Sequence, residues 1–223
     1  MIKAIIFDLD GTLLNTIDDI TNALNNTLKR YRYPTKSIEE TKLNLGSGSI
    51  HLVKESLPKG VSEEEFKNIH RDYQEYYMKN NNILTNPYPG IIELLEELKE
   101  NGYLLAVVSN KDDHDVKMLN KDKFKGLIEI AIGARKGEPV KPDPHLIKIA
   151  LKKLNLKSEE VIYVGDSDVD ILTANNANIK MITVSWGFRP YEVLLKYQAT
   201  NIINHPNELI DKVEKINDQI TRC

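Results

Sequence analysis

Near its start the chain reads Ile2-Lys3-Ala4-Ile5-Ile6-Phe7-Asp8-Leu9-Asp10-Gly11-Thr12, an apolar run that stops abruptly at acidic residues. The run is short and continuously apolar, which is typical of a central parallel strand that is buried on both faces. Ligands of parallel sheets bind beyond the carboxyl ends of the strands. The segment therefore predicts a buried first strand that delivers Asp8 and Asp10 to a ligand site.

Further short apolar runs alternate with stretches whose apolar residues have helical spacing. The runs cover residues 103–108, 127–132, 161–164, 181–184 and 202–203, and the helical stretches cover residues 90–100, 112–120, 145–154, 169–175 and 207–216. Such alternation implies a parallel sheet with helices on both faces. We expect an α/β fold with a doubly wound, Rossmann-like parallel sheet as its core.

Residues 17–82 break this alternation, because they contain helical patterns and no strand-like run. Ile17, Ile20 and Leu24, for example, recur at the spacing of one helix face. We therefore expect an all-helical domain over residues 16–82, inserted into an α/β core of residues 1–15 and 83–223. The alternative is a larger helical face of a single domain.

Composition narrows the possible functions. Of the 223 residues, 41% are hydrophobic and 28% are charged, as in ordinary globular proteins. The formal net charge of −3 argues against nucleic acid as the main partner. No apolar run is long enough to be a signal peptide or to cross a membrane. The only cysteine is Cys223, so no intramolecular disulfide can form, and we expect a cytoplasmic protein.

Polar side chains follow several of the predicted strands. Asp8 and Asp10 follow the first run, Ser109 follows the second, and a series of aspartates starts at Asp166. Carboxylates gathered at one edge of a sheet repel each other unless a cation lies among them, and oxygen ligands favour Mg²⁺. With the metal bound, one carboxylate can attack a phosphoryl group, whose oxygens need positive charge such as that of Lys141. Taken singly, Asp-Gly could be a turn, Lys141 a surface lysine and Ser109 a helix cap, so only their combination favours a site.

These residues resemble the motifs of the haloacid dehalogenase-like phosphohydrolases, and the resemblance spans essentially the whole chain. The first motif, Asp-x-Asp-Gly-Thr, matches residues 8–12, the second matches Ser109, the third matches Lys141, and the fourth, Gly-Asp-x-x-x-Asp, matches residues 165–170. Four motifs in the family's order make the similarity specific.

The resemblance implies a covalent mechanism. It makes Asp8 the nucleophile that forms an aspartyl-phosphate, and Asp10 the acid that protonates the leaving alcohol and later activates water. Mg²⁺ would be held by Asp8, by the backbone carbonyl of Asp10 and by Asp166. Asp170 would either bind the metal through water or orient its neighbours.

The resemblance also implies which residues bind substrate. We expect Thr12, Ser109, Asn110 and Lys141 to hold the phosphorylated substrate. The inserted helices resemble the helical cap that some family members carry over a catalytic core. Within this predicted cap, Leu45-Gly46-Ser47-Gly48-Ser49 is similar to a glycine-rich loop that faces the active site in the phosphoglycolate phosphatase-like branch. Gly46, Ser47 and Gly48 are therefore expected at the substrate, although a turn between helices would also explain them.

From these features we expect a Mg²⁺-dependent phosphomonoesterase that hydrolyses a small phosphorylated metabolite, with phosphoglycolate as the leading substrate. The expected assembly is a monomer or a homodimer. The alternatives are hydrolysis of another small phosphoester or of pyrophosphate, phosphoryl transfer to a sugar, and a regulatory switch based on an aspartyl-phosphate. Dehalogenation is disfavoured, because it does not need the acid and metal site that Asp10 supplies.

Overall fold

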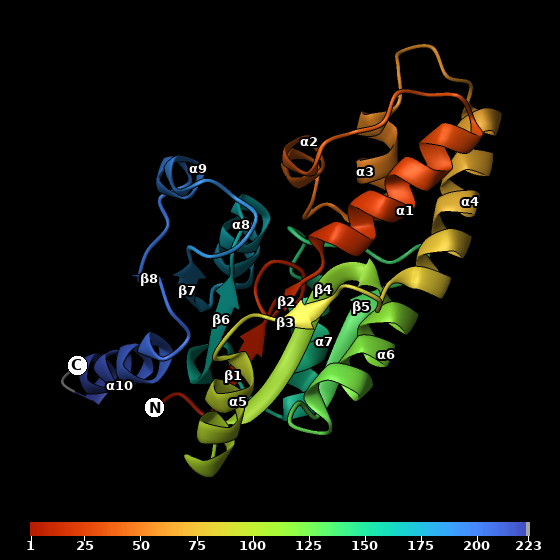
Figure 1. Cartoon of the computed structure of the whole chain (residues 1–223). Helices are drawn as coiled ribbons and strands as arrows, with labels where there is room; N and C mark the ends of the chain where they lie inside the picture. The colour runs from red at the N-terminus through yellow and green to blue at the C-terminus, as the bar shows by residue number, and fades with distance from the viewer. Residues whose placement is uncertain (222–223) are drawn as a thin grey trace.

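The computed structural model describes residues 1–221, and these form a six-stranded sheet with the order β5-β4-β1-β6-β7-β8 (Figure 1). Each neighbouring pair in this order is parallel. The strands are β1 (Ala4–Phe7), β4 (Leu104–Asp112), β5 (Ile130–Ala134), β6 (Val161–Gly165), β7 (Lys180–Val184) and β8 (Ile202–Ile203). Counted along the chain this is the order 3-2-1-4-5-6 of doubly wound folds, so the expected fold class is confirmed.

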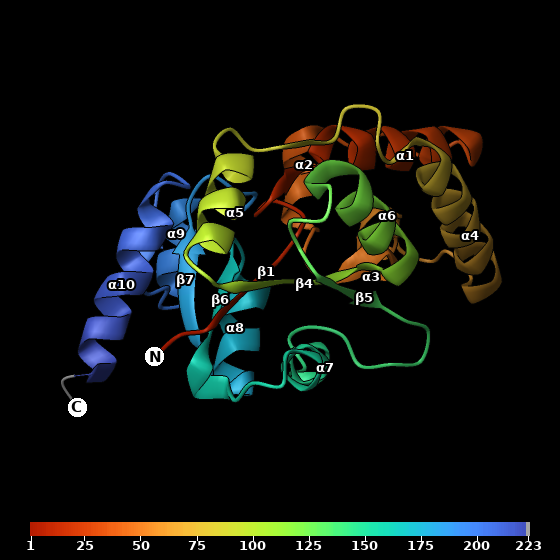
Figure 2. The same ribbon diagram turned by 90° about the horizontal axis from the view of Figure 1, so that it is seen from below.

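Helices cover both faces of the sheet, because the side chains of its buried strands alternate. Ile5 and Phe7 face one apolar cluster, and Ala4 and Ile6 face another. The first cluster is covered by α5 (Ile91–Glu100), α6 (Asp113–Phe124) and α10 (Glu208–Thr221). The second is covered by α7 (His145–Leu154), α8 (Asp168–Ala177) and α9 (Tyr191–Lys196), with the short 3-10 helix η1 (Ser158–Glu160) leading into β6. Figure 2 shows α5 and α7 on opposite sides of the sheet.

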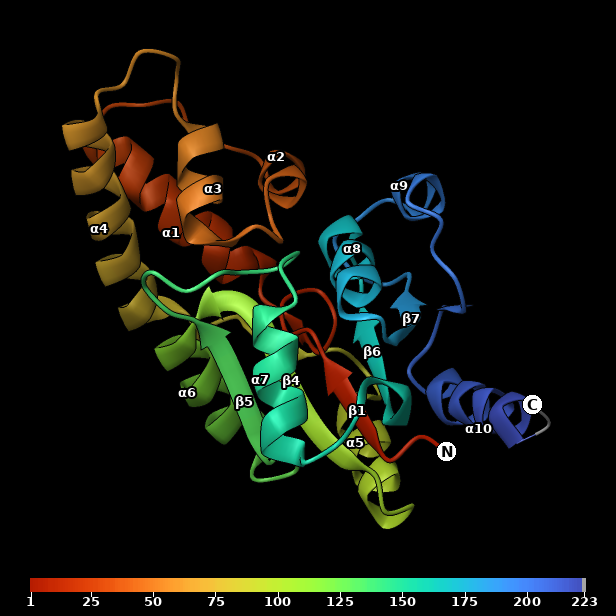
Figure 3. The same cartoon turned by 180° about the vertical axis from the view of Figure 1, so that it is seen from behind.

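Residues 17–80, which we call the helical insert, form helices beyond the carboxyl ends of the strands (Figure 3). These helices are α1 (Ile17–Arg30), α2 (Ile38–Leu43), α3 (Gly48–Ser56) and α4 (Glu63–Asn80). Ser37 and Ser62 cap α2 and α4 by accepting hydrogen bonds from backbone N–H groups. The apolar faces of α1, α3 and α4 pack into a cluster of their own, joined by Phe188 from the sheet side.

The two connections between the insert and the sheet lie side by side. The short strands β2 (Leu14–Asn15) and β3 (Asn86–Pro87) pair in an antiparallel manner. The buried carboxylate of Asp19 on α1 accepts hydrogen bonds from the backbone N–H groups of Ile83, Leu84 and Thr85, the last at 2.8 Å. Asp19 therefore fixes the start of the insert to the segment that returns to the sheet.

The structure differs from the sequence-based expectations in four elements. Strand β4 continues to Asp112, beyond the expected end at Val108, because an irregularity in its register lets Asp112 pair with Ala134 of β5. The pair β2–β3 and helix α9 were not expected, since two-residue strands and a six-residue helix are too short for a periodic pattern. Cys223 lies outside the described residues, and none of the helices within residues 1–221 is long and apolar enough to cross a membrane.

Candidate active site

Three buried carboxylates meet where the strand order of the sheet reverses. Asp8 follows β1, Asp166 follows the neighbouring strand β6, and Asp170 lies in the first turn of α8. Oxygen atoms of the three side chains lie within 4.8 Å of one another. The parallel pairing of β1 with β6 therefore brings together aspartates that are more than 150 residues apart in sequence.

One buried ammonium group neutralises part of this cluster. Lys141 Nζ donates hydrogen bonds to Asp8 Oδ1 at 2.7 Å, to Asp170 Oδ1 at 2.8 Å and to the Tyr163 hydroxyl at 2.9 Å. All three ammonium donors are thus occupied, and the Lys141 side chain is 2% exposed. The Asp8 and Asp170 carboxylates raise the pKa of Lys141 although burial opposes them, so this side chain keeps its charge.

Asp170 is fully engaged by protein donors. Its Oδ1 also accepts from the Tyr163 hydroxyl at 2.8 Å, and its Oδ2 accepts from the Ser167 hydroxyl at 2.6 Å and from the Ser167 N–H. Burial alone would raise the pKa of Asp170, but the Lys141 ammonium and these hydrogen bonds lower it. Of the two roles considered for Asp170, the geometry favours orienting its neighbours.

The negative charges of Asp8 and Asp166 are only partly offset by neighbouring positive groups. Burial, together with the neighbouring carboxylates, raises the pKa of Asp8 to about 8 even though Lys141 lowers it. Burial and the Asp170 charge raise the pKa of Asp166 to about 7. Buried carboxylates are costly unless they are paired or bind a metal, and carboxylate oxygens are the donors that hard divalent cations prefer. The donor set of Asp8 and Asp166 therefore fits such a cation.

Asp166 is held in place by close backbone approach. A Cβ atom on Gly11 would lie 2.5 Å from Asp166 Oδ2, and Gly11 has a φ of +90°, so only glycine fits there. The Thr12 hydroxyl donates to Asp166 Oδ1 at 3.1 Å, and the Phe188 N–H donates to Oδ2 at 2.7 Å. Thr12 was expected at the substrate. Its side chain instead contacts the Asp166 carboxylate, and Thr12 is not among the residues that line the cavity.

The second aspartate of the first motif has a cationic partner that the sequence reading did not assign to the site. Lys111 Nζ donates to Asp10 Oδ2 at 2.9 Å and lies 4.7 Å from the centroid of the Tyr77 ring. Among the described residues, Asp10 Oδ1 is buried without a hydrogen-bond partner. Because β4 continues past Ser109, Lys111 lies two residues further along the same strand and shares its face, which is the sequence signal that could have revealed it.

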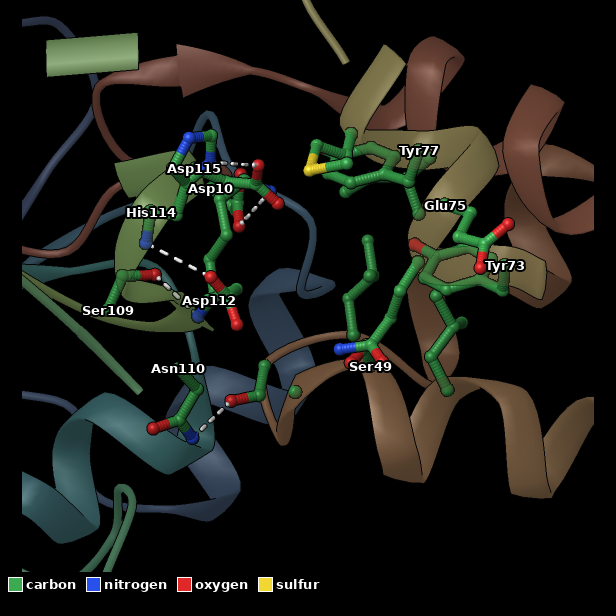
Figure 4. A pocket seen from close by; sticks show the side chains of 18 of the residues that line it. Asp10, Ser49, Tyr73, Glu75, Tyr77, Ser109, Asn110, Asp112, His114 and Asp115 are labelled. Atoms are coloured by element: carbon green, nitrogen blue, oxygen red, sulfur yellow. Dashed lines mark hydrogen bonds and ion pairs between the residues drawn. The ribbon is translucent and has the colours of Figure 1, made fainter. Parts of the chain in front are cut away.

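A cavity of about 310 Å³ connects these groups with the helical insert. Figure 4 shows Ser109, Asn110 and Asp10 on the side of the sheet and Ser49, Tyr73 and Tyr77 on the side of the insert. The insert therefore forms one wall of this cavity, and the opposite wall carries Asp8 and Asp10.

Comparison with known proteins agrees with this arrangement. The sequence profile of the family described as haloacid dehalogenase-like hydrolase matches residues 5–184. The chain belongs to the haloacid dehalogenase-like hydrolase family. The expected enzyme class, a haloacid dehalogenase-like phosphatase that hydrolyses phosphoric monoesters, is thereby confirmed.

Individual relatives cover nearly the whole chain. Phosphoglycolate phosphatase 1 of Pseudomonas aeruginosa is 28% identical over 93% of this chain and 78% of its own length. Pyrophosphatase PpaX of Bacillus cereus is 30% identical over 97% of this chain and 98% of its own length. The crystal structure of a predicted phosphoglycolate phosphatase from Haemophilus somnus is 28% identical, superposes with a TM-score of 0.87 and covers 94% of this chain and 97% of that one.

In this haloacid dehalogenase-like hydrolase, Asn110 joins three parts of the site. Its side-chain amide donates to the carbonyl of Lys141 at 2.8 Å and to the carbonyl of Gly46 at 2.9 Å, while its Oδ1 accepts from the Lys141 N–H. Asn110 thus holds the segment that carries the motif lysine and touches the glycine-rich loop of the insert.

The glycine-rich loop of the hydrolase is docked on the sheet side at two points. Gly48, the first residue of α3, has a φ of +84°, and a Cβ atom there would lie 3.2 Å from the Asn110 carbonyl oxygen. The Arg189 guanidinium donates to the carbonyls of Lys42 and Leu45 and pairs with Asp168 at 2.6 Å. The loop therefore faces the aspartates, although it also serves as a turn between α2 and α3.

The expected site residues fall into two layers. Those that line the cavity are Asp8, Asp10, Gly46, Gly48, Ser109 and Asn110. A second layer, in contact with the first or beside it, contains Thr12, Ser47, Lys141, Asp166 and Asp170. Cavity residues that the sequence analysis did not expect at the substrate include Lys111, Tyr73 and Tyr77.

Proposed function

We propose that the protein is a Mg²⁺-dependent phosphomonoesterase that hydrolyses a small phosphorylated metabolite through an aspartyl-phosphate on Asp8. The observation that carries this proposal is the contact of the Lys141 ammonium with Asp8 Oδ1 inside a cluster of buried carboxylates. An anionic nucleophile and an anionic phosphoryl group can approach each other only where positive charge offsets both.

Asp8 is the proposed nucleophile, and Asp10 the proposed acid and base. One Asp8 oxygen attacks phosphorus while Lys141 holds the other, and Asp10 transfers its proton to the departing oxygen. In the second half of the reaction Asp10 takes a proton from water, which attacks the phosphorus of the aspartyl-phosphate and regenerates Asp8. Ser109, which lines the cavity beside Asp10, is proposed to donate a hydrogen bond to a phosphoryl oxygen.

Mg²⁺ is the proposed cofactor. The residues that would hold it are Asp8 and Asp166 through their carboxylates and Asp10 through its backbone carbonyl. When bound, the ion supplies positive charge to the phosphoryl oxygens and to the carboxylates. Asp170 is proposed to act indirectly, by fixing Lys141 and the turn at Ser167.

Phosphoglycolate is the leading substrate in this proposal. A cavity of about 310 Å³ between the sheet and the insert has room for a short phosphoester, and two of the relatives above carry the name phosphoglycolate phosphatase. Pyrophosphate is the second candidate, because the PpaX relative matches over almost its full length. Sugar transfer and a regulatory switch are less well supported, since the cavity is small and the second aspartate serves turnover.

The division into a catalytic core (residues 1–15 and 83–223) and a cap (residues 16–82) is part of this proposal. The cap would enclose the substrate and exclude bulk water during the reaction. A cytoplasmic location fits a chain whose proposed substrate is a soluble metabolite. A monomer or homodimer stays a prediction.

Steady-state kinetics of the purified protein test the proposal. We expect release of inorganic phosphate from phosphoglycolate or pyrophosphate with Mg²⁺, loss of this activity with a chelator, and recovery when Mg²⁺ is restored. Asp8→Asn should abolish turnover while the far-ultraviolet circular dichroism spectrum is retained, because an amide has the same shape but lacks the nucleophilic charge. Near wild-type turnover in Asp8→Asn would exclude the covalent mechanism.

A further inference from the structure

We propose that Lys111 determines specificity by binding a negative charge on the leaving group of the substrate. This inference rests on the proposed phosphatase function and deepens it. It assigns the enzyme to phosphoesters or anhydrides whose leaving group carries an anion next to the departing oxygen, such as the carboxylate of phosphoglycolate or the second phosphate of pyrophosphate.

The first observation is the place of the Lys111 ammonium. It lies 2.9 Å from Asp10 Oδ2, and Asp10 is the proposed donor to the departing oxygen. In phosphoglycolate only one methylene group separates that oxygen from the carboxylate. A group that contacts Asp10 is therefore within reach of an anion on the leaving side of the substrate.

The second observation is that the Lys111 ammonium has hydrogen-bond donors that no acceptor among the described residues occupies. An ammonium group has three donors, and among the described residues Asp10 is its one hydrogen-bond acceptor. Lys141, in contrast, donates its three hydrogen bonds to Asp8, Asp170 and Tyr163. The Lys111 side chain is 6% exposed, so water does not fully solvate the charge that a ligand would meet.

The third observation is that the other basic side chains of the cavity lie at its rim. The side chains of Arg71 and His114 line the cavity but are 63% and 69% exposed. Asp112 and Asp115 also line it, so an anion without a buried cation of its own would be repelled. Lys111 is the buried cation of the cavity lining that can neutralise such a charge, since Lys141 is outside this lining and donates to Asp8, Asp170 and Tyr163.

The insert contributes a neutral partner at the same place. The Tyr77 side chain on α4 is 5% exposed, its ring lies beside the Lys111 ammonium, and its hydroxyl has no hydrogen-bond partner among the described residues. Burial raises the pKa of Tyr77 well above its ordinary value, so the hydroxyl stays a donor. The Lys111 ammonium from the sheet and the Tyr77 ring from the insert thus lie side by side in the cavity lining, where the anion of the leaving group would bind.

The test compares leaving groups of equal size that differ in charge. Values of kcat/KM are measured with Mg²⁺ for phosphoglycolate, pyrophosphate and 2-hydroxyethyl phosphate, in which a neutral alcohol replaces the carboxylate. The variants are Lys111→Met, which keeps the apolar stem, Lys111→Arg, which keeps the charge, and Lys117→Met, a matched control on the exposed face of α6. Circular dichroism verifies folding, and Lys111→Gln replaces Lys111→Met if the latter does not fold.

We expect Lys111→Met to lower kcat/KM on the order of 10- to 100-fold more for the anionic substrates than for 2-hydroxyethyl phosphate, mainly through KM, because a hydrogen bond to a charged group is lost. Lys111→Arg should keep most of the preference, and Lys117→Met all of it. The anionic substrate that loses more identifies carboxylate or phosphate as the group bound.

Equal losses on charged and neutral substrates would show that Lys111 acts only through Asp10, and would overturn the inference. A wild-type enzyme that prefers 2-hydroxyethyl phosphate would overturn it while the phosphatase function stands. Absence of turnover for every substrate would overturn the proposed function, and this inference with it.

Discussion

At the scale of single residues, the site depends on the Lys141 ammonium, which donates hydrogen bonds to both Asp8 and Asp170. Its ammonium contacts Asp8 and Asp170 at almost equal distances, so one cation lowers the repulsion between the proposed nucleophile and a carboxylate behind it. Removing one partner of a buried ion pair leaves an uncompensated charge, which costs about 3–5 kcal/mol in measured cases.

We therefore predict that Lys141→Ala lowers both activity and stability. Turnover of p-nitrophenyl phosphate should fall by at least about 10²-fold, since positive charge at the phosphoryl group is lost. The free energy of unfolding in Mg²⁺-free buffer should fall by about 3 kcal/mol. Urea denaturation followed by circular dichroism gives the second value.

Lys148→Ala is the control for this prediction, because Lys148 is exposed on α7 and should change neither quantity. If Lys141→Ala retained nearly the wild-type rate, the motif lysine would have to be sought elsewhere in the chain.

The sequence could predict Lys141 but not the partner of Asp10. Lys141 is recognisable because it belongs to a motif in a fixed order along the chain. Lys111 follows the second apolar run, but no role in the site was assigned to it, because apolar character ends at Val108 whereas the backbone of β4 continues to Asp112 through an irregular pairing with β5. Hydrogen bonding between strands is non-local, so hydrophobicity alone does not mark where such a strand ends.

At the scale of elements, the loop that begins α3 connects the insert to the site. Gly48 adopts a left-handed conformation, and a Cβ atom there would make a tight contact of 3.2 Å with the Asn110 carbonyl oxygen. A β-branched residue in this conformation is strained, and a side chain at this point would push the loop away from the sheet.

We predict that Gly48→Val lowers kcat/KM for phosphoglycolate by at least about 10-fold, and for p-nitrophenyl phosphate by less, because a good leaving group needs less positioning. Gly60→Val is a matched control, since Gly60 also has a left-handed conformation in the insert but faces open space. It should cost stability without changing the ratio of the two substrates. A ratio that is the same in Gly48→Val and wild type would exclude a role of the loop in substrate choice.

At the scale of the whole molecule, Arg189 connects the insert to the sheet side. Its guanidinium pairs with Asp168 on α8 and donates to the carbonyls of Lys42 and Leu45 near the end of α2. Its side chain is 9% exposed, so these contacts are little screened by water.

We predict that Arg189→Ala loosens the insert while the sheet stays intact. Amide hydrogen exchange should become faster in α2 and α3 but not in β1 and β6, and kcat/KM for phosphoglycolate should fall on the order of 10-fold. Arg30→Ala is the control, because Arg30 pairs with Asp72 within the insert and is 72% exposed. Unchanged exchange in Arg189→Ala would mean that other contacts hold the insert in place.

These long-range contacts also mark the limit of what the sequence could predict. The helices of the insert follow from their periodic apolar residues, and the parallel sheet with helices on both faces follows from the alternation of strands and helices. The docking of one on the other depends on pairs such as Arg189 with Leu45 and Asn110 with Gly46, which are 144 and 64 residues apart. No local pattern encodes such pairs. The family resemblance pointed to Gly46 and Gly48, which line the cavity, but nothing in the sequence singled out Tyr73 and Tyr77 of α4, which line it as well.

The pairing of β2 with β3 has a consequence for the history of such enzymes. Leu14 and Asn15 pair with Pro87 and Asn86, so the chain enters the insert and leaves it at neighbouring residues. Deleting, lengthening or exchanging everything between these two residues would leave the threading of β1, β4 and β6 unchanged. A different insert can therefore be joined at these paired residues, which would change the choice of substrate and leave the aspartates that follow β1 and β6 in place.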